Sequence, residues 1–140
     1  MLNKILCVED DQLLHLFLKK MVDKTDFADE IIDVYNGREA LDYYRDLSGS
    51  VDEQSPDYPE LIFLDLKMPV MGGLKFLDEF EKLFLDKFSR TNVVILTSYL
   101  VKQEREIAEQ HPFVLDYLTK PLTFEKLNEL KIKLSSPSGQ

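Results

Sequence analysis

Five short apolar runs recur along the chain, separated by longer segments of mixed polarity. The runs cover residues 5–8, 31–34, 61–64, 93–96 and 113–118. Each is nearly continuous rather than alternating, which is typical of strands that are buried on both faces of a parallel sheet. We therefore predict five buried strands.

The segments between the runs carry apolar residues at every third or fourth position, which indicates amphipathic helices. Residues 100–110 show this spacing more weakly, and residues 124–134 show it clearly, with Thr123 placed to cap the helix. The predicted buried faces are Leu14, Phe17, Leu18 and Met21; Ala40, Tyr43, Tyr44 and Leu47; Leu77, Phe80 and Phe84; and Phe124, Leu127, Leu130 and Leu134. Five alternating strands and helices, joined by right-handed crossovers, predict a doubly wound α/β fold with a parallel sheet.

Two segments fall outside this alternation. Residues 48–60 gather Gly, Ser, Pro and acidic residues, so we predict a surface loop there. Residues 135–140 read Ser-Ser-Pro-Ser-Gly-Gln, a composition that predicts a flexible tail. We expect one domain over residues 1–134, with no output domain attached.

Composition narrows the classes of function. The 140 residues carry 17 Lys and Arg against 26 Asp and Glu, a net charge of -9, which disfavours binding to nucleic acid. The acidic residues 9–11 interrupt any secretory leader, and no apolar run has membrane-spanning length, so we expect a cytoplasmic protein without a membrane partner. The one cysteine, Cys7, excludes an intrachain disulfide and a multi-cysteine metal site, and its apolar surroundings predict a buried hydrophobe.

Polar residues follow the apolar runs where a ligand would bind, since open α/β sheets bind ligands beyond the carboxyl ends of their strands. In a sheet of order 2-1-3-4-5, these residues converge on one pocket. A group of carboxylates needs a cation, and oxygen ligands suit Mg²⁺. The residues in question are Glu9, Asp10 and Asp11 after the first run, Asp65 after the third, Thr97 and Ser98 after the fourth, and Lys120 after the fifth.

This set of side chains suits phosphoryl transfer to a carboxylate. Asp65 can act as the nucleophile, because carboxylates form acyl phosphates. The transferred group needs positive and hydrogen-bonding partners, which Lys120 and the Thr97 hydroxyl supply. Pro121 leaves open whether the Lys120–Pro121 bond is cis.

Four ordered motifs resemble those of response-regulator receiver domains: ILCVEDD at residues 5–11, LIFLDLKMPVMGG at 61–73, VVILTS at 93–98 and DYLTKP at 116–121. The resemblance covers about residues 3–134. It implies a flavodoxin-like (βα)5 fold and a signalling protein that catalyses only its own phosphorylation and dephosphorylation. It also implies a histidine kinase or histidine phosphotransfer protein as phosphoryl donor, and a downstream protein as partner.

The same resemblance implies a role for each matching residue. Glu9 and Asp10 would be the acidic metal pair for Mg²⁺, Asp65 the phosphoacceptor and third metal ligand, and Lys67 a metal ligand through its backbone carbonyl. Thr97 would sense the phosphate, Lys120 would bind it, and Tyr117 would be the switch aromatic.

Several residues near these motifs have simpler interpretations. Asp11 is expected to cap a helix, and Gly72-Gly73 to form a turn into the third helix. His15 and His111 are expected at the surface. Tyr99 lies two residues beyond Thr97, where its bulk would shield an acyl phosphate from water.

Two alternative functions each lack a required element in this sequence, and a third stays open. A flavin-binding protein of this topology needs a Ser/Thr/Gly-rich phosphate loop after the first strand, where this chain has Glu-Asp-Asp. An aspartyl phosphatase needs a general acid two residues after its nucleophile, where this chain has Lys67. A docking module of the same fold that works without phosphorylation remains the alternative for experiment to decide.

Overall fold

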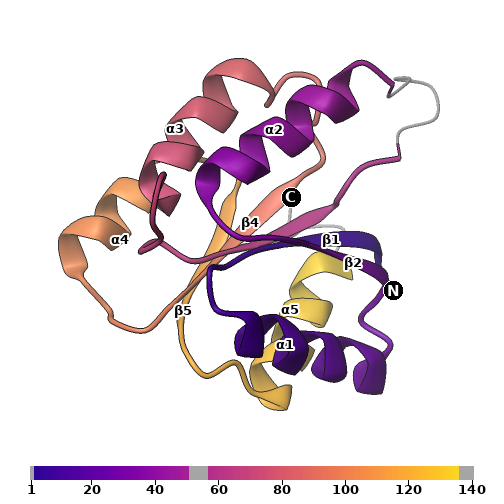
Figure 1. Ribbon diagram of the computed structural model, residues 1–140. Helices are drawn as coiled ribbons and strands as arrows, with labels where there is room; N and C mark the ends of the chain where they lie inside the picture. The colour runs from indigo at the N-terminus through magenta and orange to yellow at the C-terminus, as the bar shows by residue number, and fades with distance from the viewer. Residues whose placement is uncertain (1, 51–56, 136–140) are drawn as a thin grey trace.

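The computed structural model describes residues 2–50 and 57–135, in which strands and helices alternate (Figure 1). The strands are β1 (Leu2–Val8), β2 (Ala28–Val34), β3 (Leu61–Leu64), β4 (Asn92–Thr97) and β5 (Val114–Thr119). The helices are α1 (Gln12–Thr25), α2 (Gly37–Ser48), α3 (Gly73–Leu83), α4 (Lys102–Glu109) and α5 (Phe124–Ser135). Every predicted strand and helix is present, although β1 and β2 begin at residues 2 and 28 rather than 5 and 31.

The strands form one parallel sheet in the order β2-β1-β3-β4-β5, which confirms the predicted topology. The register aligns strand ends: Val8 of β1 lies opposite Val34 of β2 and Leu64 of β3. The residues that follow β1 and β3 therefore emerge side by side.

Alternate residues of each strand face opposite helical layers, as the two-residue period of a strand requires. Leu6 and Val8 pack into the core that α2, α3 and α4 cover, whereas Ile5 and Cys7 face α1 and α5. Figure 1 shows α2, α3 and α4 on one side of the sheet and α1 and α5 on the other. This burial on both faces explains why the strands appear in the sequence as unbroken apolar runs.

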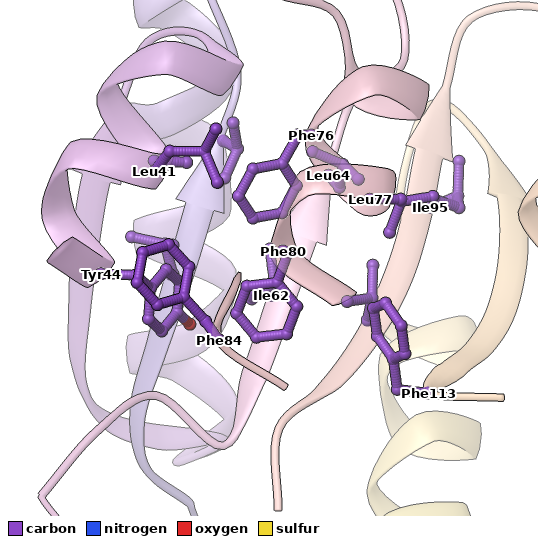
Figure 2. Packing of buried hydrophobic residues seen from close by; sticks show 14 of the residues in the cluster. Leu41, Tyr44, Ile62, Leu64, Phe76, Leu77, Phe80, Phe84, Ile95 and Phe113 are labelled. Atoms are coloured by element: carbon purple, nitrogen blue, oxygen red, sulfur yellow. The ribbon is translucent and has the colours of Figure 1, made fainter. Parts of the chain in front are cut away.

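The layer of α2 and α3 contains an aromatic cluster (Figure 2). Tyr44 of α2 meets Phe80 of α3 with ring centroids 4.9 Å apart, and it meets Phe88 at 5.0 Å, both edge to face. This geometry is favourable for aromatic pairs. We use the name aromatic cluster for Tyr44, Tyr58, Phe76, Phe80, Phe84, Phe88 and Phe113, all of which are buried.

Four side chains depart from their predicted exposure. Phe17 and Phe124 were expected on buried helix faces but are 45% and 47% exposed. His15 and His111 were expected at the surface, and this was wrong: they are 3% and 9% exposed. In each case the difference depends on which neighbours the fold supplies, as described below for the histidines.

The segments predicted to be irregular are only partly described. Helix α2 extends to Ser48, and α5 includes Ser135, so both irregular segments begin later than predicted. Residues 51–56 of the expected loop and 136–140 of the expected tail lie outside the described residues. Within the described parts of the chain, no helix has the length and apolar character needed to cross a membrane.

Candidate functional site

The backbone beyond β1 and β3 sets two carboxylates side by side. The Asp65 N–H donates to the Val8 carbonyl at 3.0 Å, and the Glu9 N–H donates to the Val34 carbonyl at 3.1 Å. These bonds continue the ladder one residue past each strand. Glu9 and Asp65 are therefore held by the sheet rather than by a mobile loop.

Three carboxylates converge at this edge. Oxygen atoms of Glu9, Asp10 and Asp65 all lie within 4.8 Å of one another. Glu9 and Asp65 are 5% and 6% exposed, whereas Asp10 is open to solvent. Such a set of hard oxygen donors fits Mg²⁺, which is commonly held by one or two carboxylates together with waters.

Lys120 brings a positive charge to the same point. Its Nζ lies 2.5 Å from Glu9 Oε1 and 3.6 Å from Asp65 Oδ2. The Lys120 N–H donates to the Thr97 carbonyl at 2.7 Å, which ties the end of β5 to the end of β4. The Lys120–Pro121 bond, left open by the sequence, is cis.

The buried carboxylates are only partly compensated. Burial raises the pKa of Glu9, while its hydrogen bond from Lys120 works in the opposite direction. Burial likewise raises the pKa of Asp65, and the Lys120 charge and the backbone amides of Lys67 and Leu66 counter it. Since one ammonium faces several carboxylates, the site favours a further cation.

These side chains line one cavity of about 300 Å³, which also includes Lys67, Thr97 and Tyr99. Thr97 is 2% exposed at the end of β4, and Tyr99 is 70% exposed at the mouth of the cavity. We call this cavity, with Glu9, Asp10, Asp65, Thr97 and Lys120, the acidic pocket.

Tyr117 does not line the acidic pocket. It lies on β5 with a buried ring, and the Arg105 guanidinium of α4 sits 5.7 Å from the ring centroid. It lines a neighbouring cavity with Leu100 and Arg105. Its position links the end of β5 to α4 rather than to the carboxylates.

The turn from β3 into α3 depends on close backbone contact. A Cβ atom on Gly73 would lie 2.4 Å from the Asp65 carbonyl oxygen, so only glycine fits. Gly72 caps α3, which confirms the predicted turn. In the same loop Val70 adopts a φ of 67°, a left-handed conformation that is costly for a β-branched residue.

Asp11 has the predicted capping role at the start of α1. Its side chain accepts a hydrogen bond from the Leu13 N–H at 2.9 Å. The Glu9 carboxylate in turn accepts from the Asp11 N–H at 3.1 Å. The first turn of α1 therefore contributes to holding Glu9.

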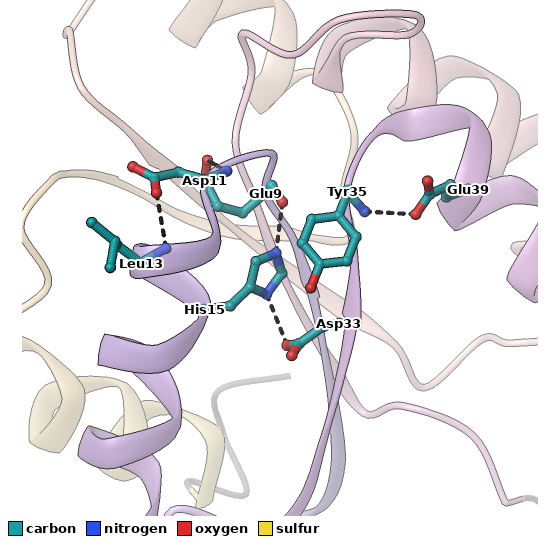
Figure 3. A network of polar contacts seen from close by, with 7 residues as sticks. All are labelled: Glu9, Asp11, Leu13, His15, Asp33, Tyr35 and Glu39. Carbon is teal, nitrogen blue, oxygen red and sulfur yellow. Dashed lines mark hydrogen bonds and ion pairs between the residues drawn. The ribbon is translucent and has the colours of Figure 1, made fainter.

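His15 is a site neighbour that the sequence reasoning missed (Figure 3). Its Nε2 lies 2.6 Å from the Glu9 carbonyl oxygen, and its Nδ1 lies 2.8 Å from Asp33 Oδ1. The ring also packs on Tyr35 with centroids 4.6 Å apart. A signal was present, because His15 precedes Leu18 and Val22 by three and seven residues and so shares their buried helical face.

His111 is a second buried histidine that was predicted at the surface, and its partners are also distant in sequence. Its Nδ1 lies 2.7 Å from Glu81 Oε1, and its Nε2 lies 3.2 Å from Asp78 Oδ1, both on α3. It thus fastens the segment before β5 to α3, away from the acidic pocket.

Comparison with known proteins identifies the relatives of this chain. The family described as "Response regulator receiver domain" matches residues 5–131. The chain is 26% identical to chemotaxis protein CheY of Bacillus subtilis, over 92% of this chain and 94% of that protein. It is 28% identical to regulatory protein AtoC of Escherichia coli over 91% of this chain, yet it spans only 24% of AtoC. A solved two-component response regulator from Cytophaga hutchinsonii superposes with a TM-score of 0.83 at 26% identity, covering 95% of this chain and 96% of that one.

Proposed function

Because this chain belongs to the family of response regulator receiver domains, signalling modules of two-component systems, we propose that Asp65 accepts a phosphoryl group. The donor is a phosphohistidine on a sensor histidine kinase or a histidine phosphotransfer protein. The chain serves as the switchable signalling component rather than as an enzyme acting on other substrates.

The observation that carries this proposal is the arrangement around Asp65. Two further carboxylates lie within 4.8 Å, and the Lys120 ammonium lies 3.6 Å away. An aspartate that merely ended a strand would need neither the neighbouring carboxylates nor the lysine. A nucleophile that must receive a group with several negative charges needs both a metal site and a fixed cation.

The chain's own residues account for the transfer. An Asp65 carboxylate oxygen attacks phosphorus and forms the new P–O bond. The P–N bond of the donor breaks, and its electron pair returns to the donor's imidazole ring. Lys120 pairs with a phosphoryl oxygen, and the Thr97 hydroxyl donates to another. Glu9, Asp10, Asp65 and the Lys67 carbonyl would hold Mg²⁺, and the bound ion would neutralise charge on the carboxylates and on the transferred group.

Phosphorylation is proposed to reach partners through β4 and β5. Thr97 would move toward the phosphate, and Lys120 would pair with the phosphate. These two movements would be coupled through the hydrogen bond from the Lys120 backbone N–H to the Thr97 carbonyl. Tyr117 lies on β5 three residues before Lys120, which directly follows that strand, and its ring faces Arg105 of α4. The surface of α4 and β5 would then present the signal to a downstream protein, or the phosphoryl group would be relayed onward.

Intact-mass measurement tests the proposal directly. Wild type incubated with Mg²⁺ and a small acyl phosphate donor should gain the mass of one phosphoryl group, whereas the Asp65→Asn variant should not. Chelation of Mg²⁺ should prevent the gain in wild type. Folded wild type that gains no mass under any donor would instead support a docking module that works without phosphorylation.

A further inference from the structure

Three different types of metal ligand lie close together near Glu9: the side chains of Cys7, His15 and Asp33. Cys7 lies on β1 directly opposite Asp33 on β2, and His15 reaches the pair from α1. The Cys7 sulfur, a His15 ring nitrogen and an Asp33 oxygen all lie within 4.8 Å of one another. We name these three residues the mixed-ligand cluster.

We propose that the mixed-ligand cluster binds a divalent transition-metal cation of the Zn²⁺ class, as a second metal site distinct from the acidic pocket. Thiolate, imidazole and carboxylate together are ligands that Zn²⁺ and Co²⁺ accept. Mg²⁺ prefers oxygen ligands alone, so the two sites differ in chemistry. This inference does not depend on the proposed phosphorylation of Asp65.

The orientation of His15 is the one that a metal-bound histidine needs. Its Nε2 lies 2.6 Å from the Glu9 carbonyl oxygen, an atom that can only accept a hydrogen bond (Figure 3). Donation to that carbonyl fixes the ring and leaves Nδ1 directed at Asp33. Metal-binding histidines nearly always donate their other ring N–H to a carbonyl or carboxylate in this way.

Small movements would complete the coordination. Bond lengths of about 2.0–2.3 Å place two ligands of a tetrahedral site roughly 3.5 Å apart. His15 Nδ1 and Asp33 Oδ1 are now 2.8 Å apart, so they must separate slightly. The Asp33 side chain is 37% exposed, which gives it room to move and gives the cation and a water ligand a path inward.

The local charge favours a cation. The Asp33 carboxylate lies within 4.8 Å of the Cys7 sulfur and of a His15 ring nitrogen. Its negative charge attracts a divalent cation, and the thiol proton passes to solvent as the metal–sulfur bond forms. His15 belongs to the cluster and also donates to the Glu9 carbonyl. A metal bound to the cluster would therefore also stiffen one wall of the acidic pocket.

Co²⁺ absorption spectroscopy in excess Mg²⁺ tests the proposal. Co²⁺ bound to a thiolate shows sulfur-to-metal charge transfer in the near ultraviolet, and Cys7 is the only cysteine of the chain. We expect this band to saturate at one equivalent and to be lost on adding Zn²⁺. Absence of the band from folded wild type would overturn the proposal and make the cluster a hydrogen-bonded packing feature.

Matched histidine variants locate the site. His15→Gln keeps a donor near the Nε2 position but removes the Nδ1 ligand, so the band should disappear. His111→Gln changes the only other histidine and should leave the band intact. If His15→Gln fails to fold, Cys7→Ala should abolish the band while circular dichroism shows a folded chain. A band of wild-type strength in either His15→Gln or Cys7→Ala would contradict the proposal.

Discussion

The aromatic cluster and the acidic pocket are both buried, yet they use burial in opposite ways. In the aromatic cluster each ring is enclosed by other apolar groups, so burial stabilises the fold. In the acidic pocket, burial raises the pKa of Glu9 and Asp65, which means that their charged forms are disfavoured. The molecule thus concentrates stability in one region and keeps an incompletely compensated charge in the other, where a ligand can compensate it.

The largest effect should come from opening the aromatic cluster. Phe80 is fully buried among Tyr44, Phe76, Phe84 and Phe113. We expect Phe80→Ala to lower the free energy of unfolding by about 3–5 kcal/mol, because it removes a large side chain and leaves a cavity. Urea denaturation measures this loss.

A matched variant and an activity measurement sharpen the first prediction. Phe17→Ala removes the same ring at a position that is 45% exposed, so its cost should stay within about 1 kcal/mol. The folded fraction of Phe80→Ala should still gain a phosphoryl group on Asp65. Loss of phosphorylation from that fraction would show that the two regions are not separable.

A substitution in the acidic pocket should raise the free energy of unfolding, whereas Phe80→Ala lowers it. The raised pKa of Asp65 means that the folded state binds its proton more tightly than the unfolded state does. Stability therefore falls as pH rises from the ordinary value of 3.8 through the raised one. We expect Asp65→Asn to be more stable than wild type at neutral pH without Mg²⁺, by less than the cost of Phe80→Ala because Lys120 offsets part of the penalty.

Denaturation curves at several pH values test this second prediction. The difference between Asp65→Asn and wild type should vanish at pH values below 3.8, where Asp65 is protonated in both states. Added Mg²⁺ should stabilise wild type more than the variant. An Asp65→Asn protein less stable than wild type at neutral pH would show that Lys120 fully compensates the carboxylate.

The third effect concerns access to the acidic pocket. Tyr99 is 70% exposed and lines the cavity, so it can shield an acyl phosphate without supporting the core. We expect Tyr99→Ala to speed dephosphorylation by up to about tenfold, or about 1.4 kcal/mol in activation free energy, with little change in stability. Loss of the phosphoryl mass over time measures the rate. Leu100→Ala, which alters the next exposed residue outside this cavity, should leave the rate unchanged.

The smallest effect lies in the loop that joins the two regions. Val70 has a φ of 67° and is 82% exposed, so its side chain adds strain and little packing. Val70→Gly should raise the free energy of unfolding by about 1 kcal/mol or less, since glycine removes the strain but is more flexible when unfolded. Val70→Ala retains a Cβ atom and should gain less, as thermal denaturation would show.

The hydrophobic pattern was sufficient to predict the strands, the helices and a doubly wound parallel sheet, because continuous apolar runs and helical spacing report local geometry. It did not determine the strand order, which followed from the resemblance of the motifs to receiver domains. The polar residues at the strand ends nominated Glu9, Asp10, Asp65, Thr97 and Lys120. Thr97 ends β4, the other four lie one or two residues beyond a strand, and parallel strands end at the same edge. The structure brings these five residues to one cavity.

What depended on the tertiary structure was the environment of residues whose partners are distant in sequence. His15 is buried because Asp33 and the Glu9 carbonyl meet its two ring nitrogens, and His111 because α3 presents two carboxylates to it. The helical period places His15 on the buried face of α1, but no local period reports which groups meet its ring nitrogens. Local pattern therefore predicts which residues reach an edge of the sheet, whereas burial of a polar side chain is decided by the groups that long-range packing brings to its donors and acceptors.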